Sequence, residues 1–331
     1  MLKLLTDLLV KLGGRLDLGT KARGLILEGG RCVGVTAVRA GAEVSYRAPA
    51  VVLADGGFQG DPELVGRFIS KCPEKIRQRG AGTGKGDAIR MLESAGAKLT
   101  GMKYFYGHLL SRDAMTREDL WPYPGLDPLA VVGIVVDGSG RRFADEGLGG
   151  VFLTNAVAWH DDPLDTWIVF DETIWQTAGM NPVFLTSPNP VLEPLMAPLF
   201  KADSLAELEQ KAGFASGTLS ATVAEHNGAI EGKTLAQLKP ARSDHTFKPA
   251  PILKKPFYAV PMCAGLTFTM GGGAVDHDMK VLKPDGSAIP GLWAAGKSIG
   301  GLEGGEPVGY TGGLCLALIT GIRAGEAIAR R

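Results

Sequence analysis

The stretch from Gly291 to Gly313 combines many glycines with one tyrosine, Tyr310, directly before an apolar helix. Glycines let backbone approach a ligand closely, and the amide groups at a helix start favour negative charge. The chemistry indicated is close approach of bare backbone to a ligand. A glycine-rich turn that only packs a helix on a sheet, with Tyr310 packed at the helix start, explains the same residues and stays open.

Two further glycine-rich segments occur earlier in the chain. Asp55-Gly56-Gly57 ends a buried strand over residues 50–54, and α/β proteins bind ligands beyond the carboxyl ends of strands. The loop over residues 80–86 leads into a helix and could hold phosphate or sugar hydroxyls through backbone amides. It lacks the Lys-Ser/Thr ending of a nucleotide-binding P-loop, so a plain tight loop remains the alternative.

The elements that position these segments fall into three parts. We expect an amphipathic helix over residues 1–12 that ends at Gly13-Gly14, and a β-hairpin that turns at Gly29-Gly30. The middle of the chain is richer in proline, and a capping box from Ser204 to Glu207 opens a helix there. The sequence predicts an α/β fold with an α+β insert, divided into residues 1–103, 104–250 and 251–331.

Composition excludes several classes of function. The chain has 331 residues, with 35 Lys plus Arg against 35 Asp plus Glu and no long basic run, so nucleic acid is not an expected partner. No apolar run reaches the roughly 20 residues of a membrane span. Cys32, Cys72, Cys263 and Cys315 have no metal-ligand spacing, so we expect no metal and reduced, buried thiols in a cytoplasmic protein.

Eight segments in order resemble one protein family. They are "VVLADGGF", "TGKGDAIRMLESAGA", "GSGRRFADE", "LSATVAEHN", "PFYAV", "TMGGGAVD", "IPGLWAAGKSIGG" and "TGGLCLALITGIRAGEAIA". The chain is similar to the fumarate reductase/succinate dehydrogenase flavoproteins, which include 3-ketosteroid dehydrogenases. The resemblance implies a partial Rossmann-like FAD-binding domain, interrupted by a substrate-capping domain, with the flavin between them.

The resemblance also implies which residues contact FAD. Asp55 replaces the family's threonine at a strand end, and Lys297 replaces the family's glutamate near the ribityl chain. Bare backbone at the start of the last helix would face the flavin, which carries negative charge when reduced. The implied cofactor-binding residues are Asp55, Gly56, Gly57, Gly84, Asp87, Gly296, Lys297, Gly312, Gly313, Cys315 and Leu316.

One feature of the family is absent from the sequence. No G-x-G-x-x-G followed by an acidic residue opens the chain. The remaining strands are therefore expected to expose apolar edges and faces. A truncated product, a second chain that supplies the first half, and a protein that has lost FAD all explain this absence.

The substrate site departs from that of a fumarate reductase, which holds a dicarboxylate with two histidines and two arginines. His108 matches one histidine, but Thr267 stands in the place of the other and Tyr310 in the place of one arginine. Residues 147–150, where the second arginine is expected, provide no cation. Because carboxylates need charge-assisted partners, the resemblance argues against a dicarboxylate substrate.

Tyr310 matches instead a tyrosine of the ketosteroid dehydrogenases, which binds the substrate carbonyl and favours the enol. The implied function is an FAD-dependent oxidoreductase that acts on a C–C bond next to a carbonyl, with hydride transfer to or from flavin N5. Its substrate would be an uncharged, perhaps ketosteroid-like, small molecule. The implied catalytic residues are Tyr310 and His108, and the substrate-binding residues are Thr267, Phe268 and Tyr106.

Other interpretations stay open. His108 fits a structural histidine equally well, and Tyr104, Phe105 and Trp121 fit either a pocket wall or core. Glu303 and Glu306 are expected to be solvated. The chain as a whole could be a split or truncated flavoprotein that needs a partner, or a fumarate-reductase-like enzyme with a rebuilt anion site.

Overall fold

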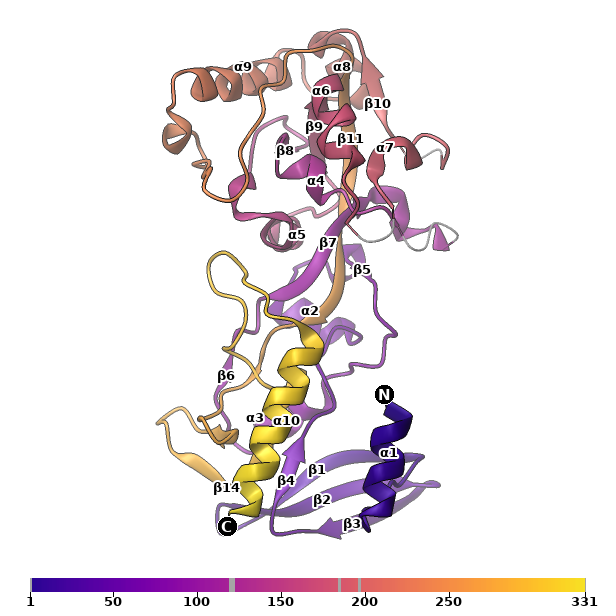
Figure 1. The fold of residues 1–331 in the computed structure, drawn as a ribbon, viewed down its shortest axis with the longest axis vertical. Coiled ribbons are helices and arrows are strands. Elements are labelled where there is room, and N and C mark those ends of the chain that lie inside the picture. The colour runs from indigo at the N-terminus through magenta and orange to yellow at the C-terminus, as the bar shows by residue number, and fades with distance from the viewer. Residues whose placement is uncertain (1, 119–122, 184–185, 196–197, 331) are drawn as a thin grey trace.

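The computed structural model describes residues 2–118, 123–183, 186–195 and 198–330. Figure 1 shows two masses joined by the strands β7 and β11. The lower mass contains the first hundred residues together with the last strands and the last helix, and the upper mass contains the middle of the chain. The arrangement agrees with the mixed α/β fold predicted from the sequence. The exact domain boundaries, residues 103/104 and 250/251, stay a prediction.

The lower mass contains two small three-stranded sheets. In one, the strands are antiparallel in the order β1-β2-β3, and the β1–β2 turn follows Glu28↔Arg31 at the predicted glycines. In the other, β4 runs parallel to β14, and β13 pairs antiparallel with the other edge of β14. The strands of these two sheets are β1 (Thr20–Glu28), β2 (Arg31–Arg39), β3 (Ala42–Arg47), β4 (Val51–Leu53), β13 (Lys280–Leu282) and β14 (Ala288–Ala294). Two short strands, β6 (Leu99–Thr100) and β12 (Gly272–Gly273), form a separate antiparallel pair.

One long strand, β11 (Phe257–Thr269), connects the two masses (Figure 1). Its first half pairs with β9 and β10 in the upper mass, and its second half pairs with β7 and, over two residues, with β5. Nine consecutive residues of β11 are buried, as expected for a central strand. The other strands of this sheet are β5 (Arg77–Gln78), β7 (Phe105–Ser111), β8 (Ile134–Asp137), β9 (Thr166–Asp171) and β10 (Phe200–Ala202).

Helices surround the sheets at positions that the sequence partly predicts. Ser204 caps α8 by accepting a hydrogen bond from the Glu207 amide at 3.2 Å, while the Glu207 carboxylate accepts from the Asp203 amide instead of completing the box. The helices are α1 (Leu2–Lys11), α2 (Pro62–Phe68), α3 (Asp87–Ser94), α4 (Asp127–Ala130), α5 (Gly150–Trp159), α6 (Glu172–Gln176), α7 (Pro188–Val191), α8 (Leu205–Ala212), α9 (Thr218–Glu231) and α10 (Gly313–Ala329). Short 3₁₀ turns add η1 (Pro73–Lys75), η2 (Arg112–Met115), η4 (Glu146–Leu148), η5 (Ala178–Met180), η6 (Leu235–Gln237) and η7 (Gly296–Ser298).

The two main apolar cores of the described residues follow this division, and a small third cluster contains Leu110, Ala114, Tyr123 and Cys263. The larger main core runs from the upper mass down to α2, so β7 and β11 are held on both sides by packed side chains. The smaller main core lies under β14, where Trp293 is fully buried among residues of α3 and the last helix. Packed cores at both ends of β7 and β11 fix the position of the polar residues that these strands carry between them.

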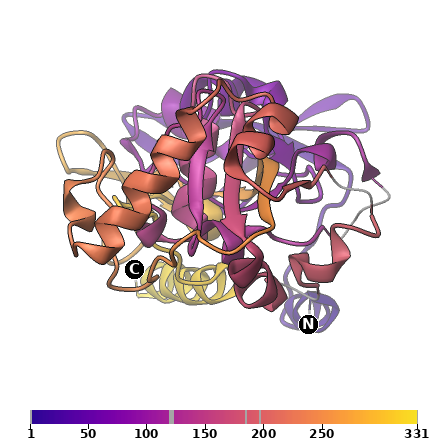
Figure 2. The same cartoon turned by 90° about the horizontal axis from the view of Figure 1, so that it is seen from above.

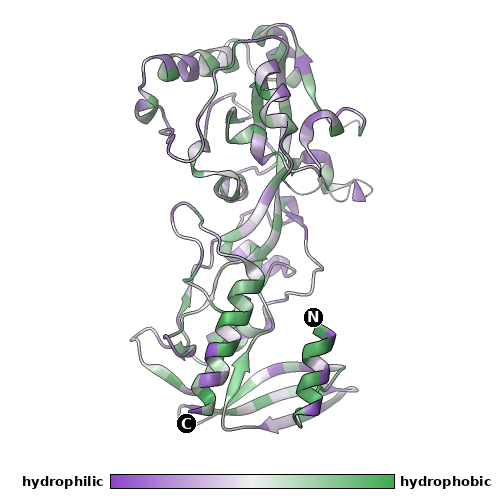
Figure 3. Cartoon of the chain, viewed as in Figure 1, coloured by the Kyte–Doolittle hydropathy of each residue, from purple (hydrophilic) through white to green (hydrophobic). Residues whose placement is uncertain are grey.

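Two helices leave their apolar faces uncovered. α1 is amphipathic as predicted, and Lys3 pairs with Asp7 at 2.7 Å, but none of its residues is buried. α10 exposes 69% of Leu314 and 59% of Ile322, and β4 next to it is the last strand of its sheet. Figure 3 shows both helices as largely apolar, and Figure 2 shows that they lie on the same side of the molecule. The expectation of exposed apolar faces and edges is confirmed.

Two expectations about whole-chain properties can be compared with the structure. No helix in the described residues is long and apolar enough to cross a membrane. All four cysteines are free thiols as predicted, but only Cys32 and Cys263 are buried. Cys315 is exposed because it lies on the uncovered face of α10, so the prediction of four buried thiols is wrong.

Candidate active site at the start of the last helix

The first turn of α10 presents backbone amides without a side-chain cap. The Gly313 amide donates to the hydroxyl oxygen of Tyr310 at 2.9 Å, and the Leu316 amide donates to the Gly312 carbonyl at 3.0 Å. Leu314 and Cys315 lie between these two residues, and their amides donate to no group among the described residues. Two N–H groups at the positive end of a 17-residue helix are thus available to a ligand.

Three aromatic rings from three elements stack beside this turn. Tyr310 lies 4.0 Å from Tyr106 of β7 between ring centroids, at 29°, and Tyr106 lies 5.0 Å from Phe268 of β11, at 21°. Phe268 and Tyr106 are neighbours because β7 and β11 pair in antiparallel register. The structure therefore brings together three residues predicted from the sequence to be catalytic or to bind substrate.

Lys297 lies beneath the same rings. Its ammonium group is 4.4 Å from the centroid of Phe268 and forms an ion pair with Glu303. Burial lowers the pKa of Lys297, although the Glu303 carboxylate opposes this shift. Only 2% of the Glu303 side chain is exposed, so the prediction that Glu303 is solvated is wrong.

Glu303 also fixes the loop before α10. Its carboxylate accepts hydrogen bonds from the amide and the hydroxyl of Thr311, at 3.0 and 2.9 Å. Although burial alone would raise it, these bonds and the Lys297 ammonium lower the pKa of Glu303. Tyr310 stands next to Thr311, so the ion pair positions the tyrosine through the backbone.

Asp55 joins three of the predicted cofactor segments. Its carboxylate accepts from the Ala88 amide in the first turn of α3 at 2.9 Å and from the Ser298 hydroxyl at 2.9 Å. Ser298 also accepts from the Gly56 amide at 3.3 Å. Burial raises the pKa of Asp55 despite these hydrogen bonds. The aspartate that replaces the family's threonine thus holds the ends of β4, η7 and α3 together.

The other predicted cofactor residues lie around this junction. A Cβ on Gly57 would stand 2.2 Å from the Thr269 hydroxyl, so the close approach of β11 already requires glycine there. Gly84 packs in the same way against Gln59, and Asp87 pairs with Lys21 at 3.6 Å. The Gly296 amide donates to Thr320 of α10 at 2.9 Å. Cys315 is exposed and Leu316 is half-buried on the first turns of α10.

A cation that the sequence analysis missed stands beside Thr267. Arg79 follows β5, and its guanidinium donates to the Thr267 hydroxyl at 3.0 Å. Arg79 lies close enough to Asp127 and Tyr106 for their charges to act on its pKa, which burial lowers. Sequence spacing could not find it, because only the parallel pairing of β5 with β11 brings it to the site.

A second missed residue is Asp127, the first residue of α4. Its carboxylate lies 3.0 Å from Nδ1 of His108, and Nε2 of His108 lies 2.9 Å from the Tyr106 hydroxyl. The His108 and Asp127 side chains are 10% and 13% exposed. Burial raises the pKa of Tyr106; Tyr310 and Asp127 raise it further, and Arg79 opposes them.

An apolar cavity of about 410 Å³ adjoins this hydrogen-bonded group. His108, Asp127 and Asn181 form its polar part, and Val131 and Phe247 belong to its apolar wall. A cavity of this size with few polar groups is suited to a small, largely apolar molecule. Phe105, by contrast, is fully buried core, Tyr104 packs on Trp159, and Trp121 lies outside the described residues.

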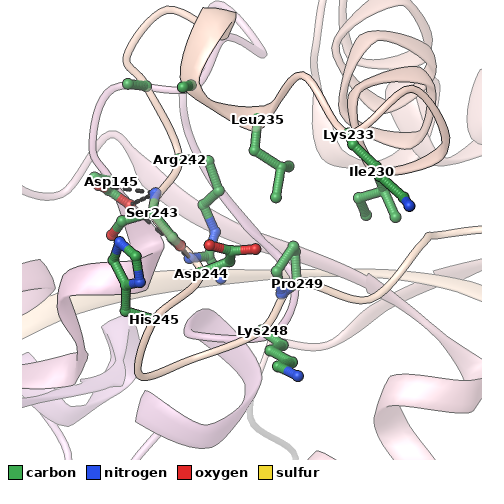
Figure 4. Close-up of a pocket in the computed structure, with 12 residues that line it drawn as sticks. Asp145, Ile230, Lys233, Leu235, Arg242, Ser243, Asp244, His245, Lys248 and Pro249 are labelled. Atoms are coloured by element: carbon green, nitrogen blue, oxygen red, sulfur yellow. Dashed lines mark hydrogen bonds and ion pairs between the residues drawn. The ribbon is translucent and has the colours of Figure 1, made fainter.

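A larger cavity of about 630 Å³ lies in the upper mass, away from the aromatic stack. Figure 4 shows Asp145, Arg242, Ser243 and His245 at its wall. The Arg242 guanidinium is fully buried, donates to the Val131 carbonyl at 2.7 Å and lies 3.4 Å from Glu146. The buried charge at its wall, Arg242, is paired with Asp145 and Glu146. The described residues contain no cluster of possible metal ligands.

Comparison with known proteins places these observations in a family. A model of the FAD binding domain matches residues 1–312. The NADH:acrylate oxidoreductase of Vibrio harveyi is 29% identical over 310 residues, which are 89% of this chain and 28% of that protein. The 4-oxocyclohex-2-ene-1-carboxylate 5-dehydrogenase of Sinomonas cyclohexanicum is 31% identical over 325 residues, which are 89% of this chain and 54% of that protein.

Among solved structures, the fold is similar to that of a 3-ketosteroid Δ1-dehydrogenase from Sterolibacterium denitrificans in complex with 1,4-androstadiene-3,17-dione. The TM-score is 0.69 at 24% sequence identity, and the match covers 99% of this chain and 62% of that one. The chain spans about half, or less, of the length of the curated relatives it matches. The resemblance inferred from the eight segments is confirmed.

Proposed function

The chain belongs to the FAD binding domain family, and on that premise we propose that it forms the flavin-holding part of an oxidoreductase that acts on a C–C bond next to a carbonyl. Bound FAD would supply a two-electron acceptor or donor for such a bond. The chain's own residues would hold the flavin, bind the carbonyl and move protons. The three tasks are assigned to separate parts of the site described above.

The residues present fit the flavin end of FAD. Gly56 at the end of β4, Gly296 after β14 and Gly312 before α10 leave bare backbone around one place, and the amides of Leu314 and Cys315 are available there. A helix N-terminus stabilises the negative charge of a reduced flavin. We propose that these groups hold the isoalloxazine and ribityl parts, with the Lys297–Glu303 pair fixing the loop that faces them.

The observation that carries the proposal is the setting of Tyr310. Its hydroxyl oxygen accepts the Gly313 N–H at 2.9 Å, which leaves the hydroxyl proton to be donated to a substrate carbonyl. A hydroxyl that accepts one hydrogen bond donates a stronger second one. Donation to the carbonyl stabilises the enolate-like charge that forms when a neighbouring C–H bond is broken.

The substrate class follows from the charges and the walls of the site. Arg79 is a single cation next to Thr267, and the adjoining cavity is mostly apolar. We propose a ring ketone that is neutral or carries one carboxylate, rather than a dicarboxylate. A relative named for 4-oxocyclohex-2-ene-1-carboxylate, a ring ketone with one carboxylate, supports this class.

The experiment is dehydrogenation of ring ketones by the purified chain loaded with FAD, using an artificial electron acceptor. We expect turnover of 4-oxocyclohex-2-ene-1-carboxylate and none of succinate. Arg79→Met should raise the KM for this carboxylate but not the KM for cyclohexanone. Arg323→Met, on the exposed side of α10, should change neither KM. Turnover of succinate with no ketone oxidised would refute the proposed substrate class and favour a rebuilt anion site.

A second candidate function is that of a partner-dependent part of a split flavoprotein. The uncovered face of α10 and the open edge of β4 favour it, since isolated apolar faces of this kind are normally covered. We propose that polypeptide carrying G-x-G-x-x-G packs there and holds the adenosine end of FAD. Ile322→Glu should abolish co-purification of such a polypeptide, while Glu225→Ala, on the exposed surface of α9, leaves it intact. A monodisperse chain that turns over ketones alone would remove this candidate.

A further inference from the structure

Three polar side chains form an unbroken hydrogen-bonded line from the apolar cavity to the aromatic stack. Tyr106 and His108 are two residues apart on β7, so both side chains point to the same face of the sheet. The Tyr106 hydroxyl lies 2.9 Å from Nε2 of His108, and Nδ1 of His108 lies 3.0 Å from the Asp127 carboxylate. The far end, at Tyr106, stacks on Tyr310 with 4.0 Å between ring centroids.

The carboxylate determines which nitrogen of His108 carries the proton. An ionised carboxylate only accepts hydrogen bonds, so Nδ1 must donate to Asp127. In neutral His108, Nε2 is then the acceptor, and the Tyr106 hydroxyl donates to it. The line therefore has one direction: it can draw a proton away from the Tyr106 oxygen.

The backbone of α5 leaves space for this arrangement. A Cβ on Gly150, the first residue of α5, would stand 2.0 Å from the Asp127 oxygen that faces His108. Any larger residue would displace the carboxylate from Nδ1. Gly150 also lies in the segment, residues 147–150, where the family resemblance leads one to expect an arginine. Here the Asp127 carboxylate packs against this segment instead.

We propose that Tyr106 is the proton-transferring group of the site and that His108 and Asp127 position it as a relay. This inference rests on the proposed function, in which Tyr310 binds the substrate carbonyl. The Tyr106 oxygen takes a proton from the carbon next to the carbonyl while its own proton passes to Nε2 of His108. The electron pair of the broken C–H bond stays on the substrate as an enolate, whose oxygen accepts the Tyr310 hydroxyl, and the imidazolium is balanced by Asp127.

The first test is the protonation of His108, read by long-range ¹H–¹⁵N NMR of the full chain, with the signal assigned through His108→Asn. The expected state is a neutral ring with the proton on Nδ1. In Asp127→Asn the amide can donate to Nδ1 and move the proton to Nε2, whereas Asp127→Glu should restore the original state. A wild-type ring with its proton on Nε2 would overturn the relay. Two other titratable groups lie near the relay: Arg79 is close to Asp127 and Tyr106, and Tyr310 is close to Tyr106.

The second test is exchange of the ring hydrogens of 4-oxocyclohex-2-ene-1-carboxylate with D₂O, measured by NMR on the chain loaded with oxidised FAD. The predicted exchange rate falls about 100-fold or more in Tyr106→Phe and about tenfold or more in Asp127→Asn. Asp127→Glu should recover most of it, and His160→Asn, at a histidine outside the relay, should leave it unchanged. Exchange that survives Tyr106→Phe, or wild-type chain that exchanges no ring hydrogen, overturns the inference.

The two failures can be told apart. Loss of the proposed function would appear as exchange without dehydrogenation, since exchange needs no electron acceptor. Loss of the relay alone would appear as dehydrogenation that requires Tyr310 but not Tyr106. Retention of the His108 signal in the Tyr106→Phe chain shows that this variant is folded.

Discussion

At the scale of single residues, the site is defined by what each polar group touches. Tyr310 accepts from the Gly313 amide, Glu303 binds both Lys297 and Thr311, and His108 lies between Tyr106 and Asp127. In the proposed function, these contacts position the groups beside the space where a flavin and a ketone would meet. The chemical roles follow from these contacts rather than from residue type alone.

Tyr310→Phe should lower kcat about 100-fold for a ring ketone, because removal of one donor to a developing oxyanion has about that effect. FAD affinity should stay the same, because the substitution removes only the hydroxyl group and keeps the aromatic ring. Steady-state rates and FAD fluorescence titration measure the two quantities. Tyr46→Phe, in β3, is the matched control and should behave as wild type. A Tyr310→Phe chain with unchanged kcat would exclude the hydroxyl as the carbonyl donor.

The Glu303 carboxylate gives the loop a pH dependence of known sign. Its pKa is lower in the folded protein than in the unfolded chain, so its stabilisation is present above the unfolded pKa and disappears as the pH falls through the folded pKa. Thermal melts from about pH 7 to about pH 3 should show this loss in wild type and a shallower loss in Glu303→Gln. Glu306→Gln, on the same loop, is the control. Identical pH slopes for wild type and Glu303→Gln would contradict this role.

At the scale of elements, β11 and α10 carry or contact several of the site residues. β11 carries Thr267 and Phe268 next to β7, and Thr269 beside Gly57, so one strand connects the substrate residues to the end of β4. α10 provides the amides at its first turn and Thr320, which fixes Gly296. A shift of either element would move the flavin and substrate groups relative to each other.

Gly57→Ala tests the close approach of β11 to the turn after β4. The added methyl group would stand 2.2 Å from the Thr269 hydroxyl, which accepts the Phe58 amide at 3.1 Å. We expect a loss of about 2 kcal/mol in the free energy of unfolding, as for other overpacked sites. Gly325→Ala in α10, where nothing lies within 4 Å of the new methyl group, should instead be neutral or stabilising. Equal unfolding midpoints in urea for the two variants would contradict the close approach.

The sequence predicted elements better than it predicted contacts. Local patterns predict the β1–β2 hairpin, the first turn of α8 and the strand before the glycine loop. The family resemblance, which also rests on local segments, indicated Tyr106, His108 and Tyr310. Arg79 and Asp127 could not be predicted, because only the pairing of β5 and β7 with β11 and the position of α4 bring them to the site. Glu303 was placed in solvent since its partner, Lys297, is visible only once the loop folds back.

At the scale of the whole molecule, the described residues form two main packed cores and leave one side uncovered. The uncovered side comprises α1, the outer edge of β4 and the exposed face of α10 (Figures 2 and 3). The groups that we propose for the flavin end lie in this chain, whereas the fingerprint that would hold the adenosine end does not occur in the 331 residues. We therefore expect this chain to bind FAD through its flavin end only.

One consequence is weak discrimination between flavins. The chain alone should bind FAD and FMN with Kd values within about threefold, a difference below about 1 kcal/mol, because the part that distinguishes them has no partner in the predicted site. Fluorescence titration with both flavins measures this ratio. FAD that binds a hundredfold more tightly than FMN would show that this chain recognises the adenosine after all.

The proposed function can be read from the visible absorption of the chain, loaded with FAD and mixed anaerobically with 4-oxocyclohex-2-ene-1-carboxylate. We expect the bands of oxidised flavin to bleach as the ketone is dehydrogenated, and Tyr310→Phe to bleach about 100-fold more slowly. Bound FAD whose bands are unchanged by this ketone and by cyclohexanone would contradict a site built for C–C bonds next to a carbonyl.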